Sequence, residues 1–278
     1  MKIGHINFLN VLPLDYGYKN FVKSDLNIVY GVPTFLNGEL ERGKIDLSNI
    51  SSIEYARQAE NLLILPKICV RADDSVTSII LVSKKPIDKI RDDKIILTSK
   101  SATAQRLLKI ILHESYDAAP NYETRAVRIE NPVDSDATGA LFIGDDALYI
   151  YLHPPKNFFV YDLGKEWRKL TGKQMIYALW AVRKKFVAEN PEIFKSTYEK
   201  IIHAFKFGIE HKSDAIKSIL PTKNFTFDEL DKYLGGAIKW NLTEEGLEAL
   251  KIYYRKAAAL KLIDAEPELE FAEVRACW

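Results

Sequence analysis

Small polar residues stand at two expected strand-to-helix turns. Ser51 and Ser52 precede one expected helix, and Ser99, Ser101 and Thr103 precede another in the run TSKSAT. The first turn of a helix has free backbone N–H groups and the positive end of the helix dipole, so each turn could hold a carboxylate. The other interpretation is that these side chains only cap their helices. Two such turns facing one cleft would favour an anion site.

Two more polar residues follow expected strands. Asn10 comes after the first strand in the run FLN, where it could point into the same cleft or bond its own backbone. Asp145 follows an apolar strand and Gly144, and it could be an acid in the cleft or the cap of the next helix. Both pairs of interpretations remain open from the residues alone.

Several common chemistries lack their motifs in this chain. The sequence contains no G-x-G-x-x-G, no G-x-x-x-x-G-K-[ST], no G-x-S-x-G and no H-E-x-x-H. Two cysteines, Cys69 and Cys277, make neither a disulfide framework nor a zinc spacing, and we expect them to be buried or terminal thiols. The histidines are scattered singly, at His5, His113, His153, His203 and His211. We therefore expect no metal site and no nucleotide cofactor.

Composition and charge exclude further classes of function. The 278 residues carry 39 Lys+Arg against 38 Asp+Glu, a formal net charge of +1, which gives no overall attraction to nucleic acid or to an anionic membrane. No uncharged stretch approaches the roughly 18 residues of a membrane-spanning helix. The N-terminus is interrupted by polar residues and does not resemble a signal peptide, so we expect a cytoplasmic protein.

The first third of the chain alternates between strand and helix patterns, which favours a mostly parallel sheet covered by helices. The run Ser51-Ser52-Ile53-Glu54 has the form of a capping box, and Pro66 is expected to end a short strand. The expected strands are 2–8, 26–30, 45–50 and 62–65, with helices over 33–42 and 51–60.

A second α/β unit then begins, and the chain later returns to the first. The apolar runs at 79–83 and 176–182 are the expected crossings between two lobes, with the last third mostly helical. The predicted division is residues 1–82 plus 180–278 for the first lobe and 83–179 for the inserted lobe. Such an arrangement leaves a cleft between the lobes, where open α/β sheets usually bind ligands.

Several longer runs resemble one known family. They are INFLNVLPL, GVPTFLNGELERGKIDLSNISSIEYA, DDSVTSIILVS, FIGDDAL and DLGKEWRKLTGKQMIYALWA. Together they resemble the chorismate dehydratases of the futalosine route to menaquinone, over about residues 2 to 183.

The resemblance implies a periplasmic-binding-protein-like type II fold and an enzyme that removes water from chorismate without a cofactor. It assigns catalysis to Asn10 in FLN and Ser78 in VTS. It also implies substrate contacts at Ser51, Ser52, Ser101 and Thr103, and implies one at Asp145 less strongly. The expected partner is chorismate, and the expected assembly is a monomer or homodimer.

Two alternatives remain beside this resemblance. The related 1,4-dihydroxy-6-naphthoate synthases carry a histidine base at a strand end where this chain reads Ile143-Gly144-Asp145, and glycine cannot be that base. A non-catalytic protein that binds small anions is the other alternative, since the same fold serves both functions.

Overall fold

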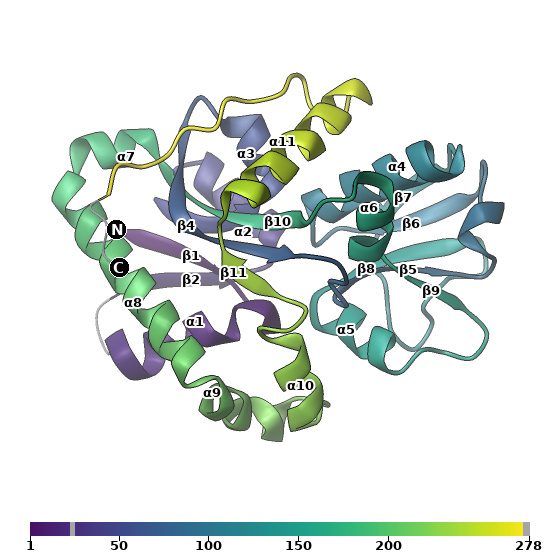
Figure 1. Ribbon diagram of the computed structural model, residues 1–278, viewed down its shortest axis with the longest axis horizontal. Helices are drawn as coiled ribbons and strands as arrows, with labels where there is room; N and C mark the ends of the chain where they lie inside the picture. Colours follow the sequence, from purple (N-terminus) through teal and green to yellow (C-terminus); the bar gives the residue numbers. More distant parts are fainter. Residues whose placement is uncertain (23–25, 275–278) are drawn as a thin grey trace.

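The computed structural model describes residues 1–22 and 26–274, and it contains two β-sheets with helices packed around them (Figure 1). Cys277 lies outside the described residues, whereas Cys69 is buried and unpaired. None of the helices in the described ranges is long and apolar enough to cross a membrane.

The larger sheet has six strands in the order β11-β4-β10-β3-β1-β2. Its strands are β1 (Lys2–Ile6), β2 (Asn27–Gly31), β3 (Leu47–Ser51), β4 (Leu62–Ala72), β10 (Met175–Arg183) and β11 (Lys239–Asn241). β1 pairs in parallel with β2 and β3, but β10 runs antiparallel to both β3 and β4. The sheet is therefore mixed and not mostly parallel as predicted, because β10 returns from the other sheet and inserts between β3 and β4.

The strand expected to end at Pro66 continues to Ala72 as β4. The pairing of β4 with β10 is irregular between the partners of Leu179 and Ala181, and Lys67 in the same stretch has a positive φ of 69°. A bulge accommodates a proline within a sheet, since its missing N–H is not needed there. The prediction of a strand end at this position was wrong for that reason.

The smaller sheet has five strands in the order β7-β6-β8-β5-β9. They are β5 (Ile79–Ser83), β6 (Lys94–Thr98), β7 (Asn121–Arg125), β8 (Gly139–Ile143) and β9 (Phe159–Asp162). β6 lies parallel to β7 and β8, and β5 lies antiparallel to β8 and β9. Its helices are η3 (Ile87–Lys89), α4 (Ala102–Tyr116), α5 (Gly144–Leu152) and α6 (Leu163–Thr171).

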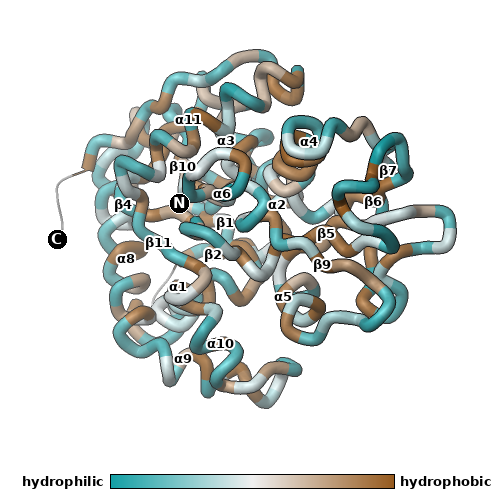
Figure 2. Tube along the Cα trace, turned by 45° about the vertical axis from the view of Figure 1, so that its right-hand side comes forward, coloured by the Kyte–Doolittle hydropathy of each residue, from teal (hydrophilic) through white to brown (hydrophobic). Residues whose placement is uncertain are grey.

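Helices of the rest of the chain surround the larger sheet (Figure 1). They are η1 (Leu9–Val11), α1 (Leu12–Gly17), η2 (Tyr18–Val22), α2 (Pro33–Glu41), α3 (Ser52–Gln58), α7 (Lys184–Glu189), α8 (Pro191–Glu210), α9 (Lys212–Ile219), η4 (Leu220–Thr222), α10 (Phe227–Tyr233) and α11 (Glu244–Ala259). Hydrophobic and hydrophilic stretches alternate along outer helices such as α8, as expected for helices with one face on the core (Figure 2).

Two glycines allow α1 and α8 to pack closely. A Cβ on Gly17 would lie 1.9 Å from the carbonyl oxygen of Ala204, and one on Gly208 would lie 1.7 Å from that of Pro13. Only glycine permits such contact between two helix backbones. The packing fixes α1, and with it the preceding turn η1 that carries Asn10.

Strand pairing also bears on the division into lobes. All of β5 pairs within the smaller sheet and all of β10 within the larger one, whereas boundaries at 82/83 and 179/180 would cut through these strands. If each sheet defines one lobe, the chain crosses between lobes at 73–78 and 172–174. We propose that these two segments, and not β5 and β10 themselves, join the lobes.

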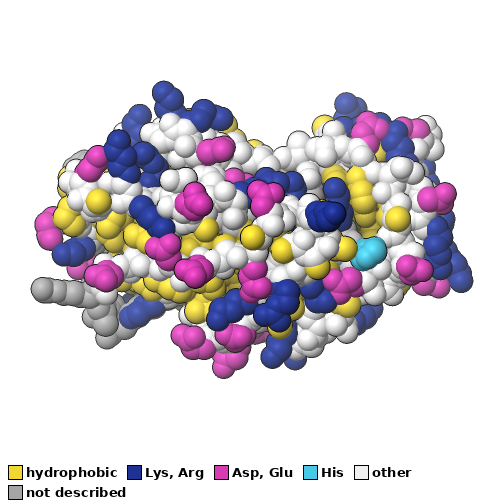
Figure 3. Space-filling model, turned by 90° about the horizontal axis from the view of Figure 1, so that it is seen from above, with side chains coloured by type: hydrophobic (Ala, Val, Ile, Leu, Met, Phe, Trp, Pro, Cys, Tyr) yellow, Lys and Arg dark blue, Asp and Glu magenta, His cyan; other side chains and the backbone are white. Residues whose placement is uncertain are grey.

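Side chains of both charges are interspersed on the face seen in Figure 3. This distribution agrees with the net charge of +1 and gives no extended field of one sign over that face.

Candidate active site

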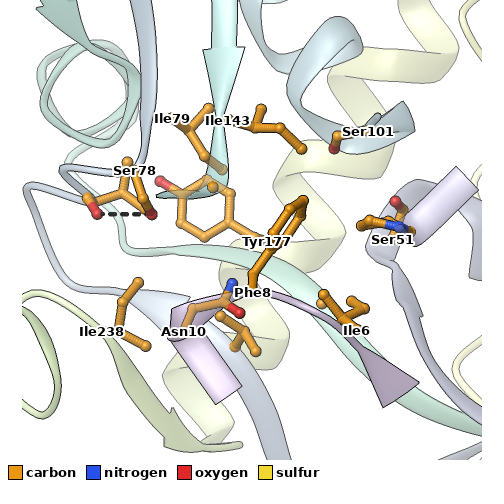
Figure 4. A pocket seen from close by; sticks show the side chains of 15 residues that line it. Ile6, Phe8, Asn10, Ser51, Ser78, Ile79, Ser101, Ile143, Tyr177 and Ile238 are labelled. Carbon is orange, nitrogen blue, oxygen red and sulfur yellow. Dashed lines mark hydrogen bonds between the residues drawn. The ribbon is translucent and has the colours of Figure 1, made fainter. Parts of the chain in front are cut away.

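A cavity lies between the two sheets, and residues from both line it (Figure 4). Its space amounts to about 480 Å³, part of it open to solvent. The apolar wall comes from strand residues and flanking loops, and the polar groups are few, as in most small-molecule sites. The lining residues are Ile6, Phe8, Asn10, Pro33, Ser51, Val70, Val76, Ser78, Ile79, Ser101, Ile143, Gly144, Tyr177, Ala178 and Ile238.

Four helices begin at this cavity. Pro33 is the first residue of α2, Ser51 is the N-cap of α3, Ser101 is the N-cap of α4, and Gly144 is the first residue of α5. Helix N-termini present partial positive charge and free N–H groups, so together they favour a bound anion. None of the described residues that line the cavity is a Lys, Arg or His. The site therefore offers positive potential without a side-chain cation.

Asn10 and Ser78, the predicted catalytic residues, both line the cavity. The backbone carbonyl of Asn10 accepts a hydrogen bond from Trp240 Nε1 at 2.7 Å, which fixes the turn η1. Its side-chain Oδ1 is buried and has no partner within the described structure. Asn10 thus presents an unsatisfied amide to the cavity, where a ligand can bond it.

The hydroxyl of Ser78 is held from two sides. It accepts a hydrogen bond from the hydroxyl of Tyr233 at 2.8 Å and donates to the carbonyl of Val76 at 3.3 Å, the bond visible beside Ser78 in Figure 4. Asp162, the N-cap of α6, also accepts from the backbone N–H groups of Val76 and Thr77, which organises this turn. The segment joining the two sheets therefore places Ser78 rigidly.

Ser51 and Ser101 line the cavity, at the two strand-to-helix turns predicted to face a cleft. Ser101 caps α4 by accepting from the N–H of Ala104 at 3.3 Å, and a hydroxyl that accepts still has its own hydrogen to donate. The predicted capping box at Ser51 was wrong, because the Glu54 carboxylate is bonded by the side chain of Gln58 at 2.7 Å and Ser51 makes no side-chain cap.

Ser52 and Thr103, predicted to contact substrate, do not line the cavity. Both are fully buried, and their side-chain oxygens lie 3.2 Å apart. Ser52 Oγ donates to the carbonyl of Ile176, and the N–H of Ile53 donates to Thr103 Oγ1. In this structure the two hydroxyls link the start of α3 to the start of α4, and a substrate contact for them stays a prediction.

Asp145 is also absent from the cavity wall. Its carboxylate accepts from the N–H of Leu9 at 3.0 Å and from Lys223 Nζ at 2.7 Å. It thus joins α5 of the smaller sheet to η1 and to the chain after η4. A direct substrate contact for Asp145 stays a prediction, because its carboxylate is already bonded to these two partners.

Sequence reasoning missed Phe8, Tyr177 and Tyr233. Burial raises the pKa of both tyrosines far above the usual range, so their hydroxyls remain protonated donors. Phe8 and Tyr177 lie within the runs INFLNVLPL and DLGKEWRKLTGKQMIYALWA. An aromatic residue in an apolar run is typical of a core, and nothing in either run distinguishes a core position from a cavity position.

The two mixed α/β sheets, each with its own helices, define a protein of the periplasmic-binding-protein fold. Among similar solved structures is the alkanesulfonate-binding protein SsuA from Xanthomonas axonopodis pv. citri, with a TM-score of 0.69, 16% identity, and coverage of 98% of this chain and 95% of that one. At this identity the likeness shows the fold alone.

Similarity in sequence identifies the family, which the similarity in fold does not. The signature of the menaquinone biosynthesis family matches residues 1–259. A chorismate dehydratase from Thermus thermophilus is 32% identical over 204 residues, covering 68% of this chain and 70% of the relative. A second, from Campylobacter jejuni subsp. jejuni, is 26% identical over 268 residues, covering 94% and 100%. The chain therefore belongs to the menaquinone biosynthesis family that includes these enzymes.

Proposed function

We propose that the protein is a chorismate dehydratase, a hydro-lyase that converts chorismate to 3-[(1-carboxyvinyl)oxy]benzoate and water for menaquinone biosynthesis. The observation that carries this proposal is the cavity where four helices begin, with a neutral polar lining and no side-chain cation among its residues. Chorismate is a dianion, and helix N-termini with hydroxyl donors suit its two carboxylates. The two chorismate dehydratase relatives support the same substrate.

The reaction needs a correctly oriented substrate more than it needs a strong acid or base. Loss of the ring hydroxyl together with a neighbouring ring hydrogen makes the ring aromatic, so the driving force lies in the substrate. The protein has to favour this elimination over rearrangement or loss of pyruvate by holding one conformation and placing partial charges. Neutral groups on rigid turns, such as Ser51 and Ser101, are suited to holding the carboxylates.

Asn10 and Ser78 are the groups we assign to the reaction itself. The side-chain NH2 of Asn10 donates a hydrogen bond to the departing hydroxyl and stabilises the negative charge that develops on its oxygen, while the buried, unpartnered Oδ1 is free to accept from the substrate. An amide is not a strong base, so the ring proton passes to the enolpyruvyl carboxylate of the substrate. Ser78 orients that carboxylate when its hydroxyl hydrogen turns from the carbonyl of Val76, 3.3 Å away, to the substrate. The C–H and C–O bonds break, the enolpyruvyl carboxyl group passes the ring proton on to the departing hydroxyl, which leaves as water, and no oxidant or reductant is consumed.

Purified protein mixed with chorismate alone tests the function. Mass analysis should show a product lighter by one water. Unchanged chorismate with clear binding would instead identify a non-catalytic binding protein and refute the proposal.

Asn10→Ala tests the assigned role within the active enzyme. It should lower kcat by about a hundredfold or more, the usual effect of losing one donor to a developing oxyanion, with a much smaller change in binding. Asn157→Ala, on the exposed surface of the smaller lobe, is the matched control and should keep the wild-type kcat. A higher KM at unchanged kcat for Asn10→Ala would make Asn10 a simple binding contact.

We also propose a cytoplasmic location and a monomeric or homodimeric state. The buried free thiol of Cys69 is compatible with a reducing compartment. Cell fractionation and light scattering on the purified protein test these two points.

A further inference from the structure

Tyr177 has an unusual hydroxyl. The side chain is buried, lines the cavity and comes from β10, yet its hydroxyl oxygen has no hydrogen-bond partner in the described structure. Other buried tyrosines do donate: Tyr233 to Ser78 Oγ, Tyr253 to the carbonyl of Thr103, and Tyr254 to that of Ser52. Buried polar groups are nearly always bonded, so an exception at a ligand cavity points to the ligand as its partner.

A β-bulge turns Tyr177 toward the cavity. In the pairing of β10 with β4, Ile176 lies opposite Arg71 and Ala178 opposite Val70, so Tyr177 is an extra residue without a partner. In a regular strand, consecutive side chains point to opposite faces of the sheet. Here Tyr177 and Ala178 both line the cavity. Bulges often redirect a side chain next to an active site.

The neighbouring groups do not satisfy this hydroxyl. Ser78 already accepts from Tyr233 and donates to Val76. The Asn10 side-chain oxygen lies in the same cavity and is likewise buried without a partner in the described chain. In Figure 4 the Tyr177 ring lies within the cavity beside Phe8, with its hydroxyl toward the side where Ser78 lies. Two unsatisfied polar atoms therefore face the space that a ligand would fill.

We propose that Tyr177 is a further substrate-binding residue, whose hydroxyl donates a hydrogen bond to a carboxylate of the bound dianion. This inference rests on the proposed function. The Tyr177 hydroxyl would bind the carboxylate in a cavity that has no lysine, arginine or histidine among its lining residues. A phenol donates to a carboxylate without carrying charge into the buried site, and such charge-assisted hydrogen bonds are among the stronger ones. Burial raises the pKa of Tyr177 well above its usual range, with Asp162 and Asp74 adding to the effect, so the donor persists at neutral and mildly alkaline pH.

Tyr177→Phe keeps the ring and removes only the hydroxyl. Because the lost bond is charge-assisted, kcat/KM for chorismate should fall by about ten- to a hundredfold. The melting temperature without substrate should be equal to or above that of the wild type, because an unsatisfied buried hydroxyl has been removed. A merely structural role predicts the opposite change in melting temperature.

Tyr18→Phe is the matched control. Tyr18 is also buried with an unpartnered hydroxyl in the described structure, but it does not line this cavity. This variant should also keep its melting temperature, and its kcat/KM should remain that of the wild type.

The possible outcomes distinguish a failure of the Tyr177 inference from a failure of the proposed function. If the wild-type protein forms product and Tyr177→Phe retains wild-type kcat/KM, the inference is wrong and the proposed function stands. Equal losses of activity in Tyr177→Phe and Tyr18→Phe would also overturn the inference. Failure of the wild-type protein to dehydrate chorismate would overturn the function itself.

Discussion

Thr103→Val distinguishes a structural contact from a substrate contact at the junction of α3 and α4. The Ser52 hydroxyl has a single hydrogen, which goes to the carbonyl of Ile176 at 2.8 Å. The 3.2 Å contact between the two hydroxyls is therefore donated by Thr103. Thr103 Oγ1 in turn accepts the N–H of Ile53 at 3.2 Å. Valine keeps the shape of threonine and removes both bonds.

The expected cost follows from these two bonds. The buried N–H of Ile53 loses its partner, which costs about 1–3 kcal/mol, and the bond to Ser52 contributes about 1 kcal/mol. The sum is about 2–4 kcal/mol, equivalent to a fall in melting temperature of roughly 5–10 °C for a chain of this size. The bond from Tyr253 to the backbone carbonyl of Thr103 is unaffected by the substitution.

Thermal unfolding and steady-state kinetics on the same preparations measure the effect. Thr197→Val is the matched control, because Thr197 is also buried but its hydroxyl, among the described residues, bonds just the carbonyl of Ile193 in its own helix, at 2.7 Å. It should change stability by less than about 1 kcal/mol. Below its melting temperature, Thr103→Val should retain the wild-type KM. A raised KM with an unchanged melting temperature would refute the structural role and support Thr103 as a substrate contact.

Two other substitutions test the surroundings of the cavity. Burial lowers the pKa of His5 from 6.5 to about 4, against the attraction of Asp15, so between these pH values the unfolded chain binds a proton that the folded chain does not. The free energy of unfolding should therefore fall by about 3 kcal/mol as pH drops through this window. In His5→Phe the free energy of unfolding, measured with urea at each pH, should change less between these pH values. An unchanged pH dependence would exclude His5 as its source. Gly144→Ala should lower the melting temperature by straining a φ of +68°, at about 1–3 kcal/mol, and should raise KM, because the new Cβ would lie 2.9 Å from the Phe8 ring. A wild-type KM for this variant would show that Phe8 does not shape the binding site.

The sequence by itself indicated the two α/β units, the strand ends that face the cavity and several residues there. These features are local: apolar runs, turn residues and small polar side chains before helices. Asn10, Ser51 and Ser101 lie at the cavity because each follows a strand or starts a helix at the same edge. The family resemblance added Ser78, which local patterns alone did not single out.

The tertiary structure decided what each polar group bonds. Ser52 and Thr103 have the same residue types and the same local pattern as Ser51 and Ser101, but the packing of α3 against α4 joins their hydroxyls. Tyr233 reaches Ser78 from 155 residues away in the chain.

The insertion of β10 between β3 and β4, with its bulge at Tyr177, depends on pairing between strands distant in sequence. Local propensity specifies which residues form a strand or start a helix, but it does not specify which strands meet. The long-range contacts alone determine which donors are satisfied and which remain free for a ligand.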